Sequence, residues 1–218
     1  MALIHIDHPN IPPSIRAAFG RKVEQIAAWL IIDPNWLMQV MYAESRLKPT
    51  AQNIQNGRVV AAGLLQWTKA SGVPGAPQSL LRYDHLQQLD FVKTYFAPYR
   101  GRMKSYFDVY LVTFFPAAVG QPDDYVFSTA KLSASLVAAQ NPAINKVKDG
   151  RITMAEFKQY VWDSTPDAVR GLVFKARQVY EDVKSEVQRI TEDGNGQSIA
   201  KAAGGIATII AFFFSSAI

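Results

Sequence analysis

The sequence predicts a mainly α-helical domain followed by a hydrophobic C-terminal tail. Apolar residues recur at helical spacing over most of the chain, strand signals are scarce, and the end of the chain is almost wholly apolar. The 218 residues, 49% hydrophobic and 19% charged, have the composition of a folded protein with a sizeable core. We therefore divide the chain into an extended leader (1–13), a helical domain (14–190), a flexible linker (191–198) and a tail (199–218).

Prolines and capping residues set the expected helix boundaries. A helical pattern starts after the proline-rich leader, and Asp33 is placed to cap a second helix that carries Pro34 in its first turn and ends before Pro49. The segment from Thr50 to Gly63 is expected to be a loop with a short hairpin around Asn56-Gly57. The other expected helices cover residues 14–30, 64–70, 86–96, 107–115, 126–139, 154–162 and 167–190.

Composition excludes several classes of site. The chain has no cysteine, which rules out disulfides, thiolate metal sites and a cysteine nucleophile. Its three histidines are not spaced like the ligands of a zinc hydrolase. The net charge of +5 suits an acidic partner, but no Lys/Arg block typical of nucleic-acid binding is present, and we expect the cluster at 99–104 to be a solvated loop. We expect no cofactor and no nucleic-acid partner.

Residues 145–156 match part of a calcium-binding EF-hand loop. Asp149, Gly150 and Glu156 occupy the expected positions 5, 6 and 12, but Asn145 stands at position 1 and Val147 at position 3. Valine has no oxygen ligand in its side chain. We therefore expect a turn that binds no metal.

The two ends of the chain bear on its location. The first residues lack a basic region followed by a long apolar run, so a protein acting outside the cytoplasm would have to be delivered in another way. Residues 202–218 supply 17 largely apolar positions (218 − 202 + 1), against the ~20 of a membrane-spanning helix. The tail is expected either to contact a membrane or to pack on protein, and both readings stay open.

Glu44 is the first candidate catalytic residue. It shares a predicted helix face with four apolar residues: Trp36, Leu37, Val40 and Met41. A carboxyl at the end of an apolar face is expected to lose solvation, which raises its pKa and lets it hold a proton near neutral pH. A glycosidic oxygen needs such a proton as it leaves. The alternative is a surface glutamate paired with Arg46 or Lys48.

Two motifs follow in a defined order. The segment Glu44-Ser45 precedes Pro49-Thr50-Ala51, and Gly63-Leu64-Leu65-Gln66 begins 19 residues after Glu44 (63 − 44). This order resembles the soluble lytic transglycosylases, relatives of goose-type lysozyme. The resemblance covers roughly residues 25–160 and implies a lysozyme-like helical domain with Glu44 as catalytic acid/base.

The resemblance also implies substrate contacts for two polar residues. Ser45 would hold the local geometry or the N-acetyl group of the substrate, and Gln66 would line the sugar groove. Taken alone, Ser45 reads as a hydroxyl that bonds to the backbone at a helix end. Gln66 alone reads as a polar residue at a helix start.

The third motif of the family, Ala-Tyr-Asn, is absent. Phe114 or Tyr110 is expected to supply its aromatic group, with plain core as the alternative for both and the preferred reading for Phe115. The aromatic-Pro-Ala-Ala-x-Gly run that ends at Gly120 resembles the phage-virion, tail-associated branch of the family. The expected location is therefore a virion, with activity in the host periplasm and cell wall.

The reaction expected from the resemblance is non-hydrolytic cleavage of the MurNAc–GlcNAc bond of peptidoglycan, with a 1,6-anhydro product. A hydrolase usually needs a second carboxylate, and no Asp or Glu occurs from Arg46 through Tyr83. Asp84 and Asp90 are the first candidates for that role. Alternatives are a hydrolytic muramidase, a non-catalytic virion protein with the same fold, and a membrane-active lysis protein working through its tail. Expected partners are glycan strands and other virion proteins.

Overall fold

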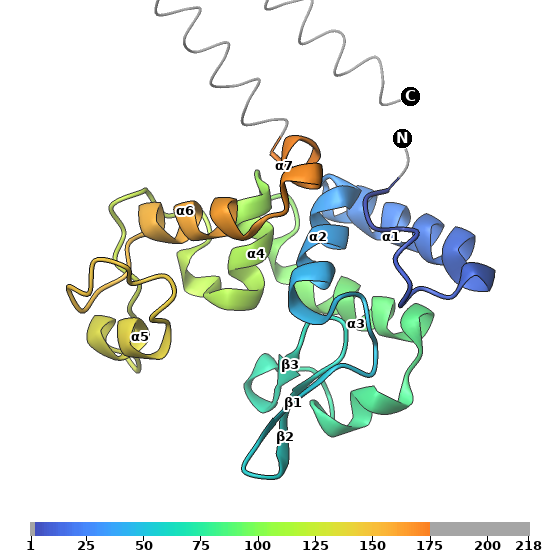
Figure 1. Ribbon diagram of the computed structural model, residues 1–218, viewed down its shortest axis with the longest axis horizontal. Coiled ribbons are helices and arrows are strands. Elements are labelled where there is room, and N and C mark those ends of the chain that lie inside the picture. Colours follow the sequence, from blue (N-terminus) through green and yellow to red (C-terminus); the bar gives the residue numbers. More distant parts are fainter. Residues whose placement is uncertain (1–2, 175–218) are drawn as a thin grey trace, which may run out of the picture. The chain divides into compact units, whose positions relative to one another are not determined.

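The computed structural model describes residues 3–174 (Figure 1). The chain divides into two compact units, Met1–Val173 and Phe174–Ile218, and the described residues belong to the first unit apart from Phe174. The expected end of the last helix, the linker (191–198) and the tail (199–218) lie outside the described residues. Within them, no helix is both long and apolar enough to cross a bilayer.

The described residues form a mainly α-helical domain, as the sequence predicts. Its helices are α1 (Arg16–Leu30), α2 (Pro34–Ser45), α3 (His85–Phe96), α4 (Tyr106–Phe114), α5 (Ala134–Gln140), α6 (Met154–Ser164) and α7 (Asp167–Val173). A small antiparallel sheet has the order β1 (Gln52–Gln55), β2 (Arg58–Ala62) and β3 (Trp67–Thr68). The hairpin expected around Asn56-Gly57 is confirmed, because both residues take left-handed backbone angles between β1 and β2.

Local chemistry places α2, the helix on which the site is built. The side chain of Asp33 accepts a hydrogen bond from the backbone N–H of Asn35, and Pro34 is the first helical residue, so the predicted start is confirmed. The helix ends at Arg46, whose φ is 52°. In Figure 1, α2 lies between α1 and α4, and it packs on both. Leu37, Val40 and Met41 are fully buried there.

Three expectations about the chain path differ from the structure. Residues 64–70 do not form an α-helix, because Gly63 and Gln66 take left-handed angles and β3 pairs with β2, and only a short 3-10 turn begins at Lys69. The helix expected over 126–139 starts only at Ala134, since Phe127 bonds through its N–H to the carbonyl of Ile152. Residues 3–13 form turns instead of an extended leader, and Leu3, Ile4 and Ile11 are buried in the domain.

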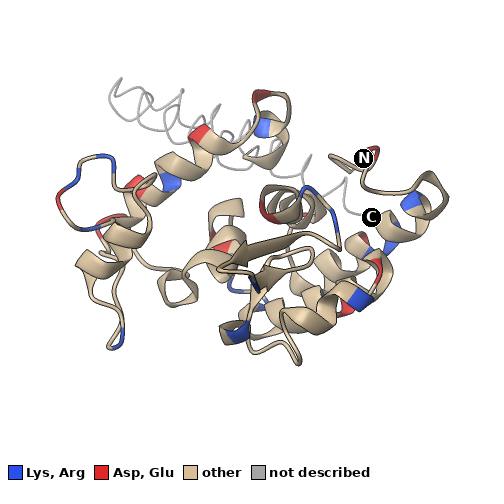
Figure 2. Ribbon diagram, turned by 60° about the horizontal axis from the view of Figure 1, so that its bottom comes forward, with Lys and Arg blue, Asp and Glu red and all other residues tan. Residues whose placement is uncertain are grey.

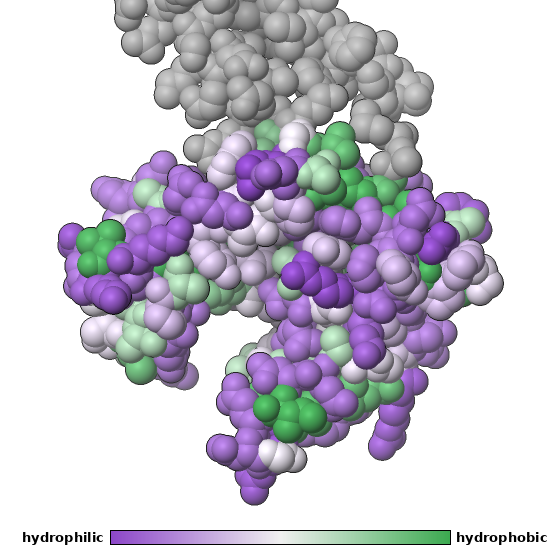
Figure 3. All heavy atoms as spheres, in the orientation of Figure 1, coloured by the Kyte–Doolittle hydropathy of each residue, from purple (hydrophilic) through white to green (hydrophobic). Residues whose placement is uncertain are grey.

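A cleft opens between two parts of this domain. Figure 3 shows a hollow with the β1–β2 hairpin on one side and the region of α5 on the other. Figure 1 is drawn in the same orientation and shows α4 and the C-terminal end of α2 at the inner end of this hollow, between its two sides. Glu44 belongs to the last turn of α2, the helix end that borders this hollow.

Candidate active site

Glu44 is a half-buried carboxyl whose proton is held unusually tightly. Burial raises its pKa from 4.5 to about 7, and a hydrogen bond from Thr113 acts in the opposite direction. The expected desolvation is therefore confirmed. The alternative ion pair with Arg46 is not formed, because the guanidinium of Arg46 lies 4.4 Å from the centre of the Tyr42 ring. No ion pair of Glu44 occurs among the described residues.

Three tyrosines lie within electrostatic reach of Glu44. Burial raises the pKa of Tyr95 to about 12, with Tyr99 and the Glu44 charge adding to the effect. Burial and then neighbouring groups, Glu44 among them, also raise the pKa of Tyr106 and of Tyr110 well above the usual value. All three phenols stay neutral at working pH. The titratable groups that respond to the Glu44 charge are therefore neutral phenols at this pH.

Ser45 fastens the end of α2 to the turn that follows the hairpin. Its buried hydroxyl lies 2.9 Å from the carbonyl oxygen of Met41 and 3.0 Å from that of Leu64. Both contacts use the single hydroxyl hydrogen, so this group is committed inside the protein. Of the two roles expected for Ser45, the geometry favours holding the local structure.

Gln66 closes the base of the same turn. Its side-chain amide nitrogen donates to the carbonyl oxygens of Ala51, at 3.2 Å, and Gly63, at 3.1 Å. Its amide oxygen has no hydrogen-bond partner among the residues that the structure describes. Gln66 therefore anchors the hairpin with one end of the amide and leaves an acceptor for a ligand at the other.

The sequence did not predict the role of Gln88, a buried residue of α3 that holds the turn at residues 63–66. Its side-chain oxygen accepts from the N–H of Leu64 at 2.8 Å, and its nitrogen donates to the carbonyl of Pro49 at 2.8 Å. A Cβ at Gly63 would lie 2.8 Å from the same oxygen, at a φ of +84°, so this position requires glycine. The Gly63–Gln66 motif is thus held from α2 by Ser45 and from α3 by Gln88.

We expect Gln88→Leu to lower the free energy of unfolding by about 3 kcal/mol, because it strands the buried N–H of Leu64 and several buried carbonyls. Urea denaturation measures the change. The exposed Gln25→Leu on α1 is the matched control and should change stability by no more than about 0.5 kcal/mol. A similarly small change for Gln88→Leu would mean that this network does not hold the turn.

The two expected aromatic residues of α4 have different surroundings. The Tyr110 ring stacks on Tyr106, at 6.0 Å between ring centres, and lies within reach of the Glu44 charge. Phe114 stacks on Phe157 of α6 at 5.2 Å, and its described ring contacts belong to this cluster. Phe115 is buried against Phe127, as expected for core. Tyr110 also stacks on Phe157, at 5.9 Å, and it is the one of the two residues whose pKa responds to the Glu44 charge.

Thr113 is the residue of α4 that contacts the acid directly, and it was not predicted. Its hydroxyl lies 3.5 Å from Oε1 of Glu44 and 2.8 Å from the carbonyl oxygen of Tyr110. The shorter contact holds the hydrogen more strongly, so the bond to Glu44 is weak. The one available signal was helical spacing, because Thr113 follows Tyr110 by three residues and shares its face.

Thr113→Val removes this donor while keeping the side-chain shape. Because a hydrogen bond to the carboxylate favours its charged form, we expect the pKa of Glu44 to rise further in the variant. NMR titration of the side-chain carboxyl carbon of Glu44 measures the pKa in both proteins. An unchanged or lower pKa would show that the Thr113 hydroxyl does not act on the acid.

The two candidates for a second catalytic carboxylate have structural partners elsewhere. Asp84 caps α3 by accepting from the N–H of Gln87, and Asp90 pairs with Lys22 at 2.8 Å. Neither is among the groups that shift the pKa of Glu44. Figure 2 shows the acidic residues on elements other than the three strands, in keeping with the acid-free segment from 46 to 83.

Metal-ligating groups do not gather in the part of the chain that the structure describes. No cluster of three or more His, Asp or Glu side chains suited to a metal occurs there. In the loop 145–156, Asp149 pairs with Arg151 at 2.7 Å. Glu156 completes a capping box with Thr153 at the start of α6. Both carboxylates of the loop are thus engaged by the chain itself.

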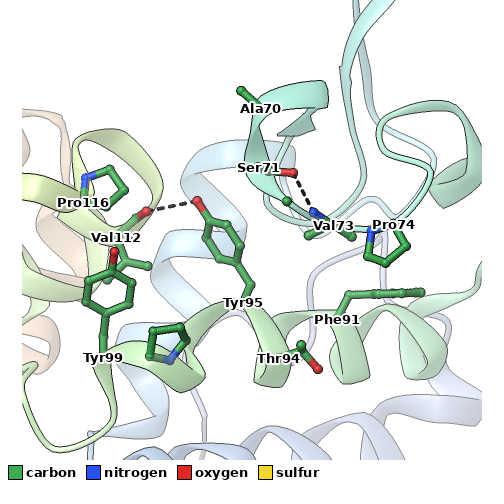
Figure 4. A pocket seen from close by; sticks show the side chains of 12 residues that line it. Ala70, Ser71, Val73, Pro74, Phe91, Thr94, Tyr95, Tyr99, Val112 and Pro116 are labelled. Atoms are coloured by element: carbon green, nitrogen blue, oxygen red, sulfur yellow. Dashed lines mark hydrogen bonds between the residues drawn. The ribbon is translucent and has the colours of Figure 1, made fainter. Parts of the chain in front are cut away.

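A pocket of about 310 Å³ lies between α3, the end of α4 and the loop 70–74 (Figure 4). Tyr95 stands at its centre and donates its hydroxyl hydrogen to the carbonyl of Val112 at 3.0 Å. Val112 immediately precedes Thr113, the partner of Glu44, so α4 contributes residues both to the pocket and to the surroundings of the acid. The facing wall is the loop that contains Ser71, Val73 and Pro74.

Comparison of the chain with protein-family models, with curated proteins and with solved structures finds no match.

Proposed function

We propose that the protein is a peptidoglycan lytic transglycosylase with a lysozyme-like domain, in which Glu44 is the catalytic acid/base. The observation that carries this proposal is the raised pKa of Glu44, about 7, in the last turn of α2, whose end borders an open cleft. A carboxyl with this pKa is partly protonated at neutral pH and can both give and take a proton there. The motif order around Glu44 and Gln66 identifies a glycan strand as the substrate that suits it.

The proposed reaction proceeds in two proton transfers. Glu44 first protonates the oxygen that links C1 of MurNAc to GlcNAc, and that C1–O bond breaks. The resulting carboxylate then takes the proton from the C6 hydroxyl of the same MurNAc, whose oxygen bonds to C1 and closes the 1,6-anhydro ring. The acid returns to its starting state, and the intramolecular attack gains rate from proximity.

Anhydro-ring formation is proposed over hydrolysis because one acid is enough for it. A hydrolase usually needs a second carboxylate as nucleophile or to activate water. Asp84 and Asp90, the nearest candidates in sequence, are engaged at the cap of α3 and with Lys22. The neutral tyrosines around Glu44 cannot take this part, because their raised pKa keeps them protonated.

Mass spectrometry of products from purified peptidoglycan tests the proposal, with Glu44→Gln as the control. The expected products carry 1,6-anhydro-muramyl ends and are absent with the variant. Reducing ends instead would identify a hydrolytic muramidase. No product from either protein, where a known lytic enzyme works, would favour a non-catalytic virion protein with the same fold.

Delivery by a phage particle is part of the proposal and comes from the resemblance of the segment ending at Gly120. In this setting the protein would open the host wall locally, with other virion proteins as partners. The tail (199–218) would contact either those proteins or the membrane. Deleting the tail distinguishes wall cleavage by the domain from membrane lysis by the tail. Wall cleavage that survives the deletion would exclude a lysis protein that works through its tail.

A further inference from the structure

We propose that the pocket between α3 and the 70–74 loop binds the peptide stem that the muramic sugar of the substrate carries. This inference rests on the proposed function and adds a second specificity site to it. A stem peptide is short and bears both small apolar side chains and free carboxylates. The pocket offers a surface for the first and unpaired cations for the second.

Three of the four hydroxyl side chains that line the pocket already bond to the chain, which disfavours a sugar ring as its occupant. The hydroxyl of Tyr95 is committed to Val112, that of Ser71 to the carbonyl of Thr68 at 2.7 Å, and that of Thr94 to the carbonyl of Asp90 at 3.0 Å. A sugar presents hydroxyls on every side and would lose hydrogen bonds to water here without replacing them.

The rest of the lining suits small apolar groups. Prolines form part of each wall, with Pro74 on the loop side and Pro116 beside α4, and the ring of Phe91 lies on the same side of the pocket as Pro74 (Figure 4). A volume of about 310 Å³ is too small for a folded partner and large enough for a few residues of peptide. An alanine methyl group buried against these surfaces leaves water at little cost.

Two cations without acidic partners among the described residues are neighbours of pocket-lining residues, one in space and one in sequence. The guanidinium of Arg102 lies 5.4 Å from the ring centre of Tyr99, one of the pocket-lining residues. Lys69 begins the short 3-10 turn whose other residues, Ala70 and Ser71, line the opposite wall. Neither cation forms an ion pair within residues 3–174. Both can therefore meet a stem carboxylate without breaking an ion pair.

The position of the pocket agrees with the path of the substrate. Tyr95 lines the pocket and also lies within reach of the Glu44 charge. The stem is attached to the muramic sugar whose bond is cut, so a site for the stem must lie next to the catalytic acid. A stem seated here would hold the muramic C1 in place beside Glu44, which is a positioning effect on the reaction.

Calorimetric binding to the Glu44→Gln protein tests this site separately from catalysis. The two probes are a MurNAc–GlcNAc oligosaccharide with its stem peptides and the same oligosaccharide after their enzymatic removal. We expect the stem to tighten binding about tenfold or more, less so at high salt because part of the gain is ionic. Equal affinity for both probes would overturn the proposal.

Two variants locate the effect in the pocket. Ala70→Trp places a large ring at an exposed lining position, and Arg102→Gln removes one flanking cation. The first is expected to abolish the difference between the probes and the second to reduce it. Their controls, the exposed Ala17→Trp and Arg21→Gln on α1, should keep the full difference. A full difference in Ala70→Trp would place the stem elsewhere.

Wild-type cleavage assays on the two substrates keep the two proposals apart. Stem-dependent binding without cleavage by wild type would leave the pocket assigned and contradict the catalytic proposal. If the wild type cleaves both substrates equally well and the affinities are equal, the catalytic proposal is supported and the assignment of the pocket is contradicted.

Discussion

Glu44→Gln is expected to lower the rate of glycan cleavage by about a thousandfold or more while leaving the fold intact. Glutamine keeps the shape of the side chain but can neither give a proton to the leaving oxygen nor take one from the C6 hydroxyl. General acid–base catalysis contributes about 10²- to 10⁴-fold, and here one residue supplies it twice. Turnover on purified peptidoglycan measures the loss, and circular dichroism checks folding.

The pH dependence of cleavage by the wild type should also show that Glu44 acts as the acid. The first step needs protonated Glu44, whose pKa is about 7. The rate limited by this step should therefore fall about tenfold per pH unit above neutrality. The residual activity of Glu44→Gln should not show this fall in rate above neutral pH. A wild-type rate that stays flat from pH 6 to 9 would contradict the assignment of Glu44 as the acid.

The second large effect is a stabilisation of the folded protein by the same substitution at high pH. The pKa of Glu44 is about 7 when folded and 4.5 in the reference state without burial. A raised carboxyl pKa means that folding favours the protonated form. The associated stability is fully present below pH 4.5 and is lost as the pH rises through 7. Ionised Glu44 therefore costs the wild type up to about 3 kcal/mol at pH 9.

Because glutamine carries no charge to desolvate, the variant escapes this cost. Its unfolding free energy should exceed that of the wild type at pH 9 by up to about 3 kcal/mol, with the difference closing toward pH 5. Urea denaturation at several pH values measures it, and the exposed Glu24→Gln on α1 controls for the exchange itself. A difference that does not change with pH would show that burial does not perturb Glu44.

These two effects have one physical origin. Burial of the Glu44 carboxyl keeps its proton on near neutral pH, and the same burial makes its charged form unfavourable. A residue that destabilises the fold under ordinary conditions is typical of a site selected for chemistry. No structural role of Glu44 offsets this cost, since its one described side-chain partner is the distant hydroxyl of Thr113.

The sequence alone determined the features that depend on local chemistry. Asp33 and Pro34 start α2 by a cap and a fixed backbone angle, and Asn56-Gly57 turns the hairpin because both residues tolerate left-handed angles. The apolar spacing along α2 placed Glu44 at the end of a buried face. Each of these effects acts between residues that are close in the sequence, so it can be predicted from the sequence alone.

Only the tertiary structure decided which residues converge on Glu44. Thr113 lies 69 residues away in sequence, and Tyr95 comes from a different helix. The segment 64–70 follows a helical pattern but is held in turns and a strand by Ser45 and Gln88, through hydrogen bonds across 19 and 24 residues. Such pairings leave no local signature, because they form only when α2, α3 and α4 pack together.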